Sequence, residues 1–227
     1  MPELPEVETV KETLKNFIIG RTIKAVVLKY DKIIKYPSVD EFVLKITNQT
    51  FTDIRRYGKY LLFDLNDFTM VSHLRMEGKY YIKDLEEDRK KHEHVIFYFT
   101  DDTTMRYHDT RKFGTFDLIL KKNLETFHPI QKLGPEPFGQ KMNADYLHNT
   151  LKGKTVAIKT ALLDQTIIAG LGNLPAVITA GFGIGLFEKY VGAIIGTAYE
   201  VAAPVSMLLI VLVFRQISMR KNRQAVK

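Results

Sequence analysis

The sequence contains no cysteine. A chain without thiols forms no disulfide framework and no cysteine-ligated zinc site, and a reducing cytoplasm is its natural compartment. A secretory signal is also missing, because Glu3 and Glu6 stand where a signal peptide carries a positive charge followed by an apolar run. We therefore expect a cytoplasmic protein that holds no metal ion and no other cofactor.

The charge of the chain is positive. Lys and Arg number 33 against 26 Asp and Glu, which gives a formal net charge of +7 over 227 residues. This length suffices for one large or two small domains with a substantial core. An excess of positive charge suits a polyanionic partner such as DNA or an anionic membrane surface, although many basic proteins bind neither.

One amphipathic helix followed by many short strands is the pattern of residues 1–131. Apolar side chains recur at helical spacing over residues 6–18, and Gly20 follows as a stop signal. Turn residues then separate short β-rich runs, which predicts an α+β chain whose first domain is a β-sandwich or barrel. The predicted strands are residues 23–30, 50–54, 60–65, 69–74, 79–82, 95–100, 104–107 and 115–120.

Two other segments interrupt this pattern. Residues 84–92 are almost all charged, which is typical of a solvated hairpin loop, with a binding patch as the alternative. Residues 133–137, Leu-Gly-Pro-Glu-Pro, disfavour regular structure and predict a domain boundary. Beyond that boundary we predict helices over residues 143–151 and 155–168, the second ending at a glycine-rich turn.

The last part of the chain, residues 174–227, is strongly apolar. Residues 191–214 contain Glu200 as their one charge, and several basic residues follow them. The segment is long enough to span a bilayer, with the basic flank that the positive-inside rule expects. Pro204 and Glu200 argue against a spanning helix, and a buried pair of helices is the alternative.

Six sequence blocks follow one another along residues 1–173: Pro2-Glu3-Leu4-Pro5-Glu6-Val7-Glu8-Thr9, Arg56-Tyr57-Gly58-Lys59-Tyr60-Leu61-Leu62, His73-Leu74-Arg75-Met76-Glu77-Gly78, His108-Asp109-Thr110-Arg111-Lys112-Phe113-Gly114, Leu133-Gly134-Pro135-Glu136-Pro137, and Leu163-Asp164-Gln165 with Ala169-Gly170-Leu171-Gly172-Asn173. In this order they resemble the formamidopyrimidine-DNA glycosylase family. The resemblance covers residues 1–173 and does not extend to residues 174–227. It implies an N-terminal catalytic β-sandwich domain over residues 1–131 and an incomplete helix-two-turn-helix DNA-binding domain over 132–173.

The function that this resemblance implies is base-excision repair of double-stranded DNA. The family removes oxidised purines, 8-oxoguanine and formamidopyrimidines, and then cleaves the strand by β,δ-elimination. Removal of Met1 would leave Pro2 with a free secondary amine, whose pKa of about 8 leaves much of it unprotonated at neutral pH. Such an amine can attack the sugar C1′ and form a Schiff base. We expect a monomer that acts on DNA in the nucleoid.

The resemblance assigns catalytic roles to four residues, Pro2, Glu3, Glu6 and Lys59. By analogy Glu3 is the general acid that protonates the opening sugar ring. Glu6 is a supporting carboxylate or, equally, a charge that complements the helix dipole. Lys59 follows a glycine before an apolar strand, where its ammonium would face the phosphate beside the lesion. Glu8 requires no role beyond a solvated helix face.

Further residues match the family's DNA contacts. An extruded nucleotide leaves a gap, and Met76, Arg111 and Phe113 match the three residues that fill it, although Met76 and Phe113 taken singly are more typical of a core. His73 is a candidate phosphate contact. Lys112 stands where the family usually has a second arginine, which keeps the charge but loses a bidentate grip.

The chain departs from the family after Asn173. Asn173 itself, in the Gly-Leu-Gly-Asn turn, is either a phosphate contact or a simple helix cap. Beyond it the family continues to a lesion-capping loop and a four-cysteine zinc finger, which this sequence lacks. We therefore expect weakened activity, with an inactive truncated or fused remnant, tethered to a membrane through residues 191–214, as the alternative. A glycosylase for oxidised pyrimidines is a further, less favoured alternative.

Overall fold

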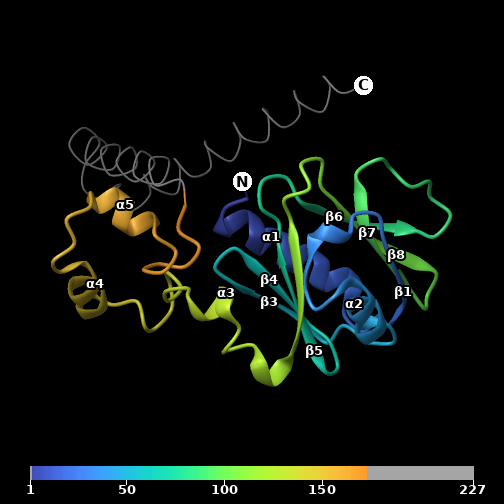
Figure 1. Ribbon diagram of the computed structural model, residues 1–227, viewed down its shortest axis with the longest axis horizontal. Coiled ribbons are helices and arrows are strands. Elements are labelled where there is room, and N and C mark those ends of the chain that lie inside the picture. Colours follow the sequence, from blue (N-terminus) through green and yellow to red (C-terminus); the bar gives the residue numbers. More distant parts are fainter. Residues whose placement is uncertain (1, 173–227) are drawn as a thin grey trace, which may run out of the picture. The chain divides into compact units, whose positions relative to one another are not determined.

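The computed structural model describes residues 2–172 and begins with helix α1 (Leu4–Ile18) (Figure 1). This confirms the predicted helix over residues 6–18, which starts two positions earlier because Pro5, with its fixed φ, is well tolerated in a first helical turn. Val7, Leu14 and Ile18 form the buried face of α1. The helix packs against strands β3 (Asp53–Tyr57) and β4 (Tyr60–Asp64).

Two β-sheets follow α1. The first has the strand order β1-β7-β8-β6 and is antiparallel throughout. The second has the order β2-β9-β5-β4-β3, in which only β2 and β9 are parallel. Their remaining strands are β1 (Ile23–Leu28), β2 (Ile34–Tyr36), β5 (Phe68–His73), β6 (Lys79–Asp84), β7 (Glu93–Phe99), β8 (Thr103–His108) and β9 (Thr115–Leu120).

One apolar core joins the two sheets. It unites Phe97 of the first sheet, Phe63 and Phe116 of the second, and the buried face of α1. A second cluster on the second sheet contains Leu62 and Val71, and is covered by the segment between η2 (Lys121–Asn123) and the middle of α3 (His128–Gln131) through Leu124, Phe127 and Ile130. The N-terminal part is thus a β-sandwich within an α+β fold, as the strand pattern predicted.

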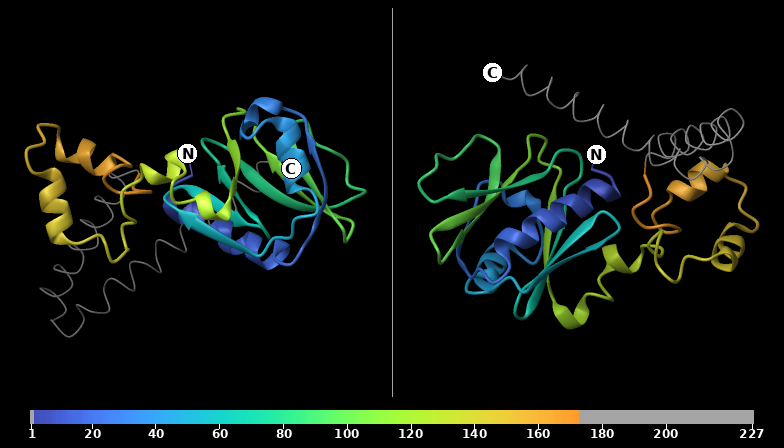
Figure 2. Two further views of the ribbon diagram at one scale, coloured as in Figure 1. Left: turned by 60° about the horizontal axis from the view of Figure 1, so that its bottom comes forward. Right: turned by 180° about the vertical axis from the view of Figure 1, so that it is seen from behind.

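Helix α2 (Val39–Ile46) was not predicted. Its local signals are ordinary: the Ser38 hydroxyl accepts the Glu41 amide N–H at 3.4 Å, and Phe42 and Ile46 are buried. Such N-caps and an apolar stripe favour a helix. Figure 2 shows this helix beside the sandwich, where it packs on β1 and β2.

The segment after residue 133 contains two short helices. Helix α4 (Ala144–Leu151) confirms the predicted helix, and the Asn143 side chain caps it by accepting the Tyr146 amide N–H at 2.8 Å. The prediction of one helix over residues 155–168 was wrong, since α5 spans Ile158–Leu163 only. Asp164 ends it, because its carboxylate accepts both the amide and the hydroxyl of Thr166, a local turn that competes with helical hydrogen bonding.

The predicted tail lies outside the described residues. Residues 174–227, and with them the spanning segment 191–214, are not covered by the structure. Within residues 2–172 none of the helices combines the length and the apolar character that a bilayer crossing requires.

Asp117 on β9 is a buried carboxylate whose substitution should stabilise the fold. Burial raises its pKa to about 6, although Lys35 opposes the shift. Because the folded state binds this proton more tightly, stability falls as the pH rises from about 4 to about 6. Asp117→Asn should therefore raise the unfolding free energy at pH 8 by roughly 1–3 kcal/mol and leave it unchanged near pH 4. Urea unfolding at both pH values measures this, with the exposed Asp88→Asn as control; a gain equal at both values would contradict it.

Candidate active site and nucleic-acid interface

The start of α1 fixes the backbone of Pro2 and Glu3. The Glu6 carboxylate accepts the Glu3 amide N–H at 2.6 Å, and the Glu3 carbonyl accepts the amide N–H groups of Glu6 and Val7. Glu6 thus forms part of a capping box at the start of α1. This cap also places Pro2 directly beside the first turn of the helix.

Lys59 and Glu3 form an ion pair. Lys59 lies in the two-residue turn between β3 and β4, and Gly58 before it has a φ of 56°, which favours glycine. The Lys59 ammonium lies 2.5 Å from Glu3 Oε2 and its side chain is 6% exposed. A Cβ at position 172 would overlap the Glu3 carboxylate, so Gly172 allows this carboxylate its position. The structure thus brings together two of the predicted catalytic residues.

His73 is a neutral histidine next to this pair. Burial, with the positive charges of Arg75 and Lys59, lowers the His73 pKa to about 3. Its Nδ1 accepts the Arg75 amide N–H at 2.9 Å, so we assign the ring proton to Nε2. Nε2 is then free to act as a donor to an anion. Glu3, Lys59, His73 and Arg75 line one cavity of about 410 Å³, which combines an acid with several donors.

A second cavity of about 520 Å³ lies at the N-terminal end of α1. Pro2, Glu6 and Met76 line it, together with the apolar side chains of Val10 and Leu14. Met76 is exposed in the turn that follows β5 and is not a core residue. The predicted nucleophile and the predicted apolar wedge therefore face the same cavity.

Arg111, Lys112 and Phe113 lie in the exposed turn between β8 and β9. The Arg111 guanidinium lies 4.9 Å from the centroid of the Phe113 ring, and the ring is 52% exposed. Lys112 has a φ of 60°, and its ammonium lies 5.0 Å from the Tyr30 ring. The segment is thus a turn that places Arg111 and Phe113 together.

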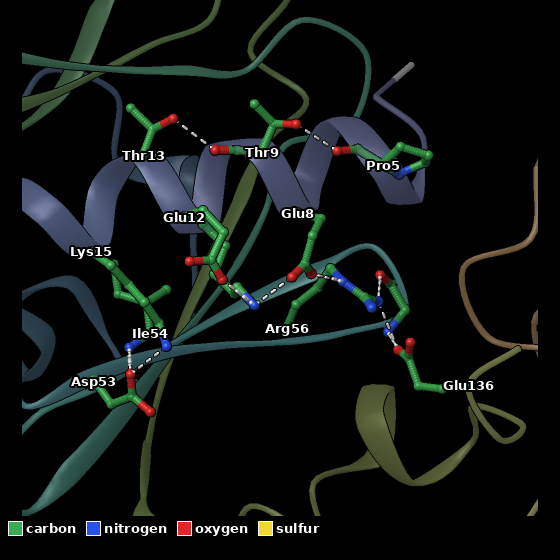
Figure 3. A network of polar contacts seen from close by, with 12 residues as sticks. Pro5, Glu8, Thr9, Glu12, Thr13, Lys15, Asp53, Ile54, Arg56 and Glu136 are labelled. Carbon is green, nitrogen blue, oxygen red and sulfur yellow. Dashed lines mark hydrogen bonds and ion pairs between the residues drawn. The ribbon is translucent and has the colours of Figure 1, made fainter. Parts of the chain in front are cut away.

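A polar network that the sequence patterns did not predict supports the Lys59 turn (Figure 3). Arg56 contacts the Glu8 carboxylate at 2.7 Å, and its Nη1 contacts Glu136 Oε1 at 2.8 Å and the Gly58 carbonyl at 2.9 Å. Glu136 also accepts the Gly58 amide N–H. The network therefore joins α1, the Lys59 turn and the segment that follows residue 133.

Glu8 was wrongly expected to be a merely solvated residue. Hydrogen bonds from Lys11 and Arg56 lower its pKa and keep it ionised. Burial alone would lower the pKa of Arg56, but its bonds to Glu136 and Glu8 outweigh burial and raise it. Arg56 and Glu136 lie in two of the motif blocks, which was the one available signal; their contact spans 80 positions of sequence.

Two expectations concern residues or ligands that the structure does not place. Asn173 lies outside the described residues. Among residues 2–172, no group of three or more His, Asp and Glu side chains is arranged to hold a metal ion. Because the whole sequence contains no cysteine, it also supplies none of the ligands of the four-cysteine zinc finger that the resemblance implies.

Comparison with known families gives two matches. Residues 1–116 match the formamidopyrimidine-DNA glycosylase N-terminal domain, and residues 133–176 match the H2TH domain of the same family. The formamidopyrimidine-DNA glycosylase of Bacillus licheniformis is 51% identical over 175 residues, which are 77% of this chain and 64% of that protein. That of Bacillus subtilis is 49% identical, over 77% of this chain and 63% of that protein. The chain thus spans less than two thirds of the length of these relatives.

Solved structures give the same result. A crystal structure of Lactococcus lactis Fpg with DNA containing an abasic site matches with a TM-score of 0.71 and 39% identity, over 76% of this chain and 64% of that chain. A complex of the inhibited Lactococcus lactis enzyme with N7-benzyl-Fapy-dG DNA matches with a TM-score of 0.72 and 39% identity, over 77% and 65%. The sandwich, the ordered motif blocks and both domain matches agree: the chain belongs to the formamidopyrimidine-DNA glycosylase family.

Proposed function

We propose that this chain is a base-excision DNA glycosylase and abasic-site lyase that removes oxidised purines from double-stranded DNA. The observation that carries the proposal is the Glu3–Lys59 ion pair beside Pro2 at the start of α1. The acid of this pair, Glu3, directly follows Pro2, the residue whose backbone amine becomes free when Met1 is removed. The solved relatives were crystallised with abasic and formamidopyrimidine-type DNA, which supports the same substrate class for this chain.

The proposed chemistry begins at the sugar. The Pro2 amine donates its electron pair to C1′, the bond from C1′ to the base breaks, and the base leaves with the proton that the Pro2 nitrogen releases. Glu3 protonates O4′ as the C1′–O4′ bond opens, which produces an iminium between Pro2 and C1′. The iminium acidifies the C2′ proton, whose loss expels the 3′ phosphate oxygen; a second elimination expels the 5′ phosphate oxygen, and water finally releases the sugar remnant from Pro2.

The remaining predicted residues would bind and deform the DNA. Lys59 and neutral His73 supply donors for the phosphate beside the lesion. The exposed Met76 and Phe113 would enter the stack, and Arg111 would donate to the orphaned cytosine. Lys112 adds a phosphate contact. This set, with Leu4-Pro5 after the nucleophile, favours oxidised purines over oxidised pyrimidines.

A trapping experiment tests whether the free amine of Pro2 is the nucleophile. Borohydride reduction during incubation with a duplex that pairs 8-oxoguanine with cytosine should give a covalent adduct at low salt. Low salt matters because phosphate contacts determine the salt dependence of binding. A chain extended by two residues before Met1 should give none, since its proline nitrogen is an amide.

Three outcomes separate the alternatives. An adduct from the native chain and none from the extended chain supports the proposal. An equal adduct from both would place the nucleophile on a lysine. No adduct from the native chain, with mass spectrometry showing that Met1 has been removed, would favour the inactive remnant.

A further inference from the structure

Asp109 is a buried carboxylate under the exposed turn that carries Arg111 and Phe113. It is 0% exposed and follows the last residue of β8. Its Oδ1 accepts the Arg111 amide N–H at 3.0 Å, and its Oδ2 accepts the Gly114 amide N–H at 2.8 Å. The two oxygens therefore bind the beginning and the end of the turn, so its shape depends on this one side chain.

Strand β7 holds the backbone of Asp109. The Asp109 amide N–H donates to the carbonyl of His92 at 3.0 Å, and the Asp109 carbonyl lies 2.9 Å from Nε2 of His94. Both backbone groups of Asp109 thus have partners, one in His92 directly before β7 and the other in the His94 side chain on β7, as buried polar groups require. The turn is fixed to the sheet at Asp109 while Arg111 and Phe113 remain exposed.

Tyr107 links this turn to the turn that carries Met76. The Tyr107 hydroxyl lies 3.5 Å from Asp109 Oδ2 and is packed so closely on Gly78 and Gly114 that a Cβ at either glycine would overlap it. Gly78 belongs to the Met76 turn, whose backbone is closed by a 3.0 Å hydrogen bond from the Gly78 amide to the Leu74 carbonyl. Both exposed turns therefore rest on the same hydroxyl.

The ring of Tyr107 is fixed in the core. It packs edge-on against Phe116 and Tyr80, with ring centroids 4.9 Å and 5.2 Å away. Burial raises the pKa of its hydroxyl, and the charge of Asp109 adds to this effect, so the group keeps its proton. A protonated hydroxyl on a tightly packed ring gives both turns a fixed packing contact.

We propose that Asp109 and Tyr107 are positioning residues that hold Met76, Arg111 and Phe113 in one arrangement and thereby set the preference for cytosine opposite the lesion. This inference rests on the proposed function. Cytosine presents two adjacent acceptors, O2 and N3, which suit the donor-only guanidinium of Arg111, whereas adenine presents N1 beside an amino donor. Hydrogen bonds to two adjacent acceptors require an accurately placed guanidinium. A displaced turn should therefore lose the preference for cytosine before it loses excision of the damaged base.

The variants Asp109→Asn and Tyr107→Phe test this role. Asparagine keeps one acceptor and places a donor where the second backbone N–H must bind, and phenylalanine removes only the hydroxyl. Single-turnover excision of 8-oxoguanine opposite cytosine should fall about tenfold in Asp109→Asn, the effect of one lost buried hydrogen bond. The ratio of the rates opposite cytosine and opposite adenine should fall with it, and Tyr107→Phe should show a smaller change in the same direction.

The controls separate positioning from general damage to the fold. Asp88→Asn and Tyr98→Phe are matched changes outside the core and should leave the ratio unchanged. Borohydride trapping on a single-stranded abasic oligonucleotide needs no opposite base, so both positioning variants should keep it within about twofold. Equal losses on both opposite bases and on single-stranded DNA would overturn the inference.

A second readout needs no chemistry and separates this inference from the proposed function. The sequence contains no tryptophan, so Phe113→Trp introduces a single indole. Its fluorescence should be quenched more by a tetrahydrofuran-containing duplex with cytosine opposite the site than with adenine. Adding Asp109→Asn should remove this difference. If the native chain traps no DNA but the indole still distinguishes the two duplexes, the catalytic proposal fails and the positioning role stands; an indole that responds to neither duplex overturns the positioning role.

Discussion

Glu3→Gln is expected to slow the excision of 8-oxoguanine by about 10²–10⁴-fold, the usual contribution of a general acid. Cleavage at a preformed abasic site should be affected far less. An abasic sugar already exchanges with its open aldehyde form, so Pro2 can form its iminium without an acid to open the ring. The substitution also removes the charge that pairs with Lys59 at 2.5 Å, and the ammonium becomes free to bind phosphate.

The measurement is a pair of single-turnover rates, one on the lesion duplex and one on the abasic duplex. Glu12→Gln is the matched control, because Glu12 lies on the same helix and, among residues 2–172, pairs only with Lys11, at 2.8 Å, on an exposed face. Thermal unfolding of both variants checks that α1 still forms. An equal loss of both rates would contradict the assignment, since it would indicate that Glu3 supports the site as a whole and not the protonation of the sugar.

Local patterns predicted much of the sandwich. The strands of residues 60–65, 69–74 and 115–120 became β4, β5 and β9 within one residue at each end. These strands are buried almost along their whole length, so their composition is strongly β-like. The prediction of residues 155–168 as one helix failed because a single side-chain turn at Asp164 outweighed helical periodicity.

The site was predictable only as separate pieces. Motifs named Glu3, Lys59 and Met76, but not that Glu3 pairs with Lys59. Contacts between distant segments carry the rest: Glu136 reaches the Lys59 turn across 78 positions of sequence. Neither composition nor periodicity contains information about such pairs, because each partner taken alone has the local pattern of a surface residue.

The charged segment 84–92 also depends on a contact with a distant residue that its local sequence did not indicate. It was expected to be a solvated hairpin loop, and its side chains are mostly exposed. The hairpin was wrong, because the segment joins β6 to β7, and β8 lies between these two strands in the sheet. The backbone of the segment, however, is fixed from below by Arg106, whose guanidinium donates to the carbonyls of Asp84, Glu87 and Asp88. Arg106 lies in the middle of β8 and is 2% exposed. A single arginine in a predicted strand gave no sign that it would be buried.

Arg106→Met is accordingly expected to lower the unfolding free energy by about 3–5 kcal/mol, the usual cost of removing one partner of a buried ion pair. Arg106 Nη1 lies 3.2 Å from Glu93 Oε2, and both side chains are almost fully buried. Without Arg106, the one remaining cation near Glu93 among the described residues is Lys83, at 3.9 Å. Three loop carbonyls lose their donor as well. Urea unfolding at pH 7 measures the change, with the exposed Arg89→Met as control.

The double variant Arg106→Met with Glu93→Leu separates the two causes of this loss. Met and Leu replace the ion pair by apolar side chains of similar volume, so no buried carboxylate is left without its cation. Such replacements often leave the unfolding free energy unchanged or raise it. If the buried charge dominates, the double variant should recover most of the lost stability. If the loop carbonyls dominate, it should remain as unstable as Arg106→Met, and hydrogen exchange should increase over residues 84–92 alone. We expect the first result, because leaving one ionised carboxylate unpaired in the core costs more than returning three carbonyls to water at an exposed loop.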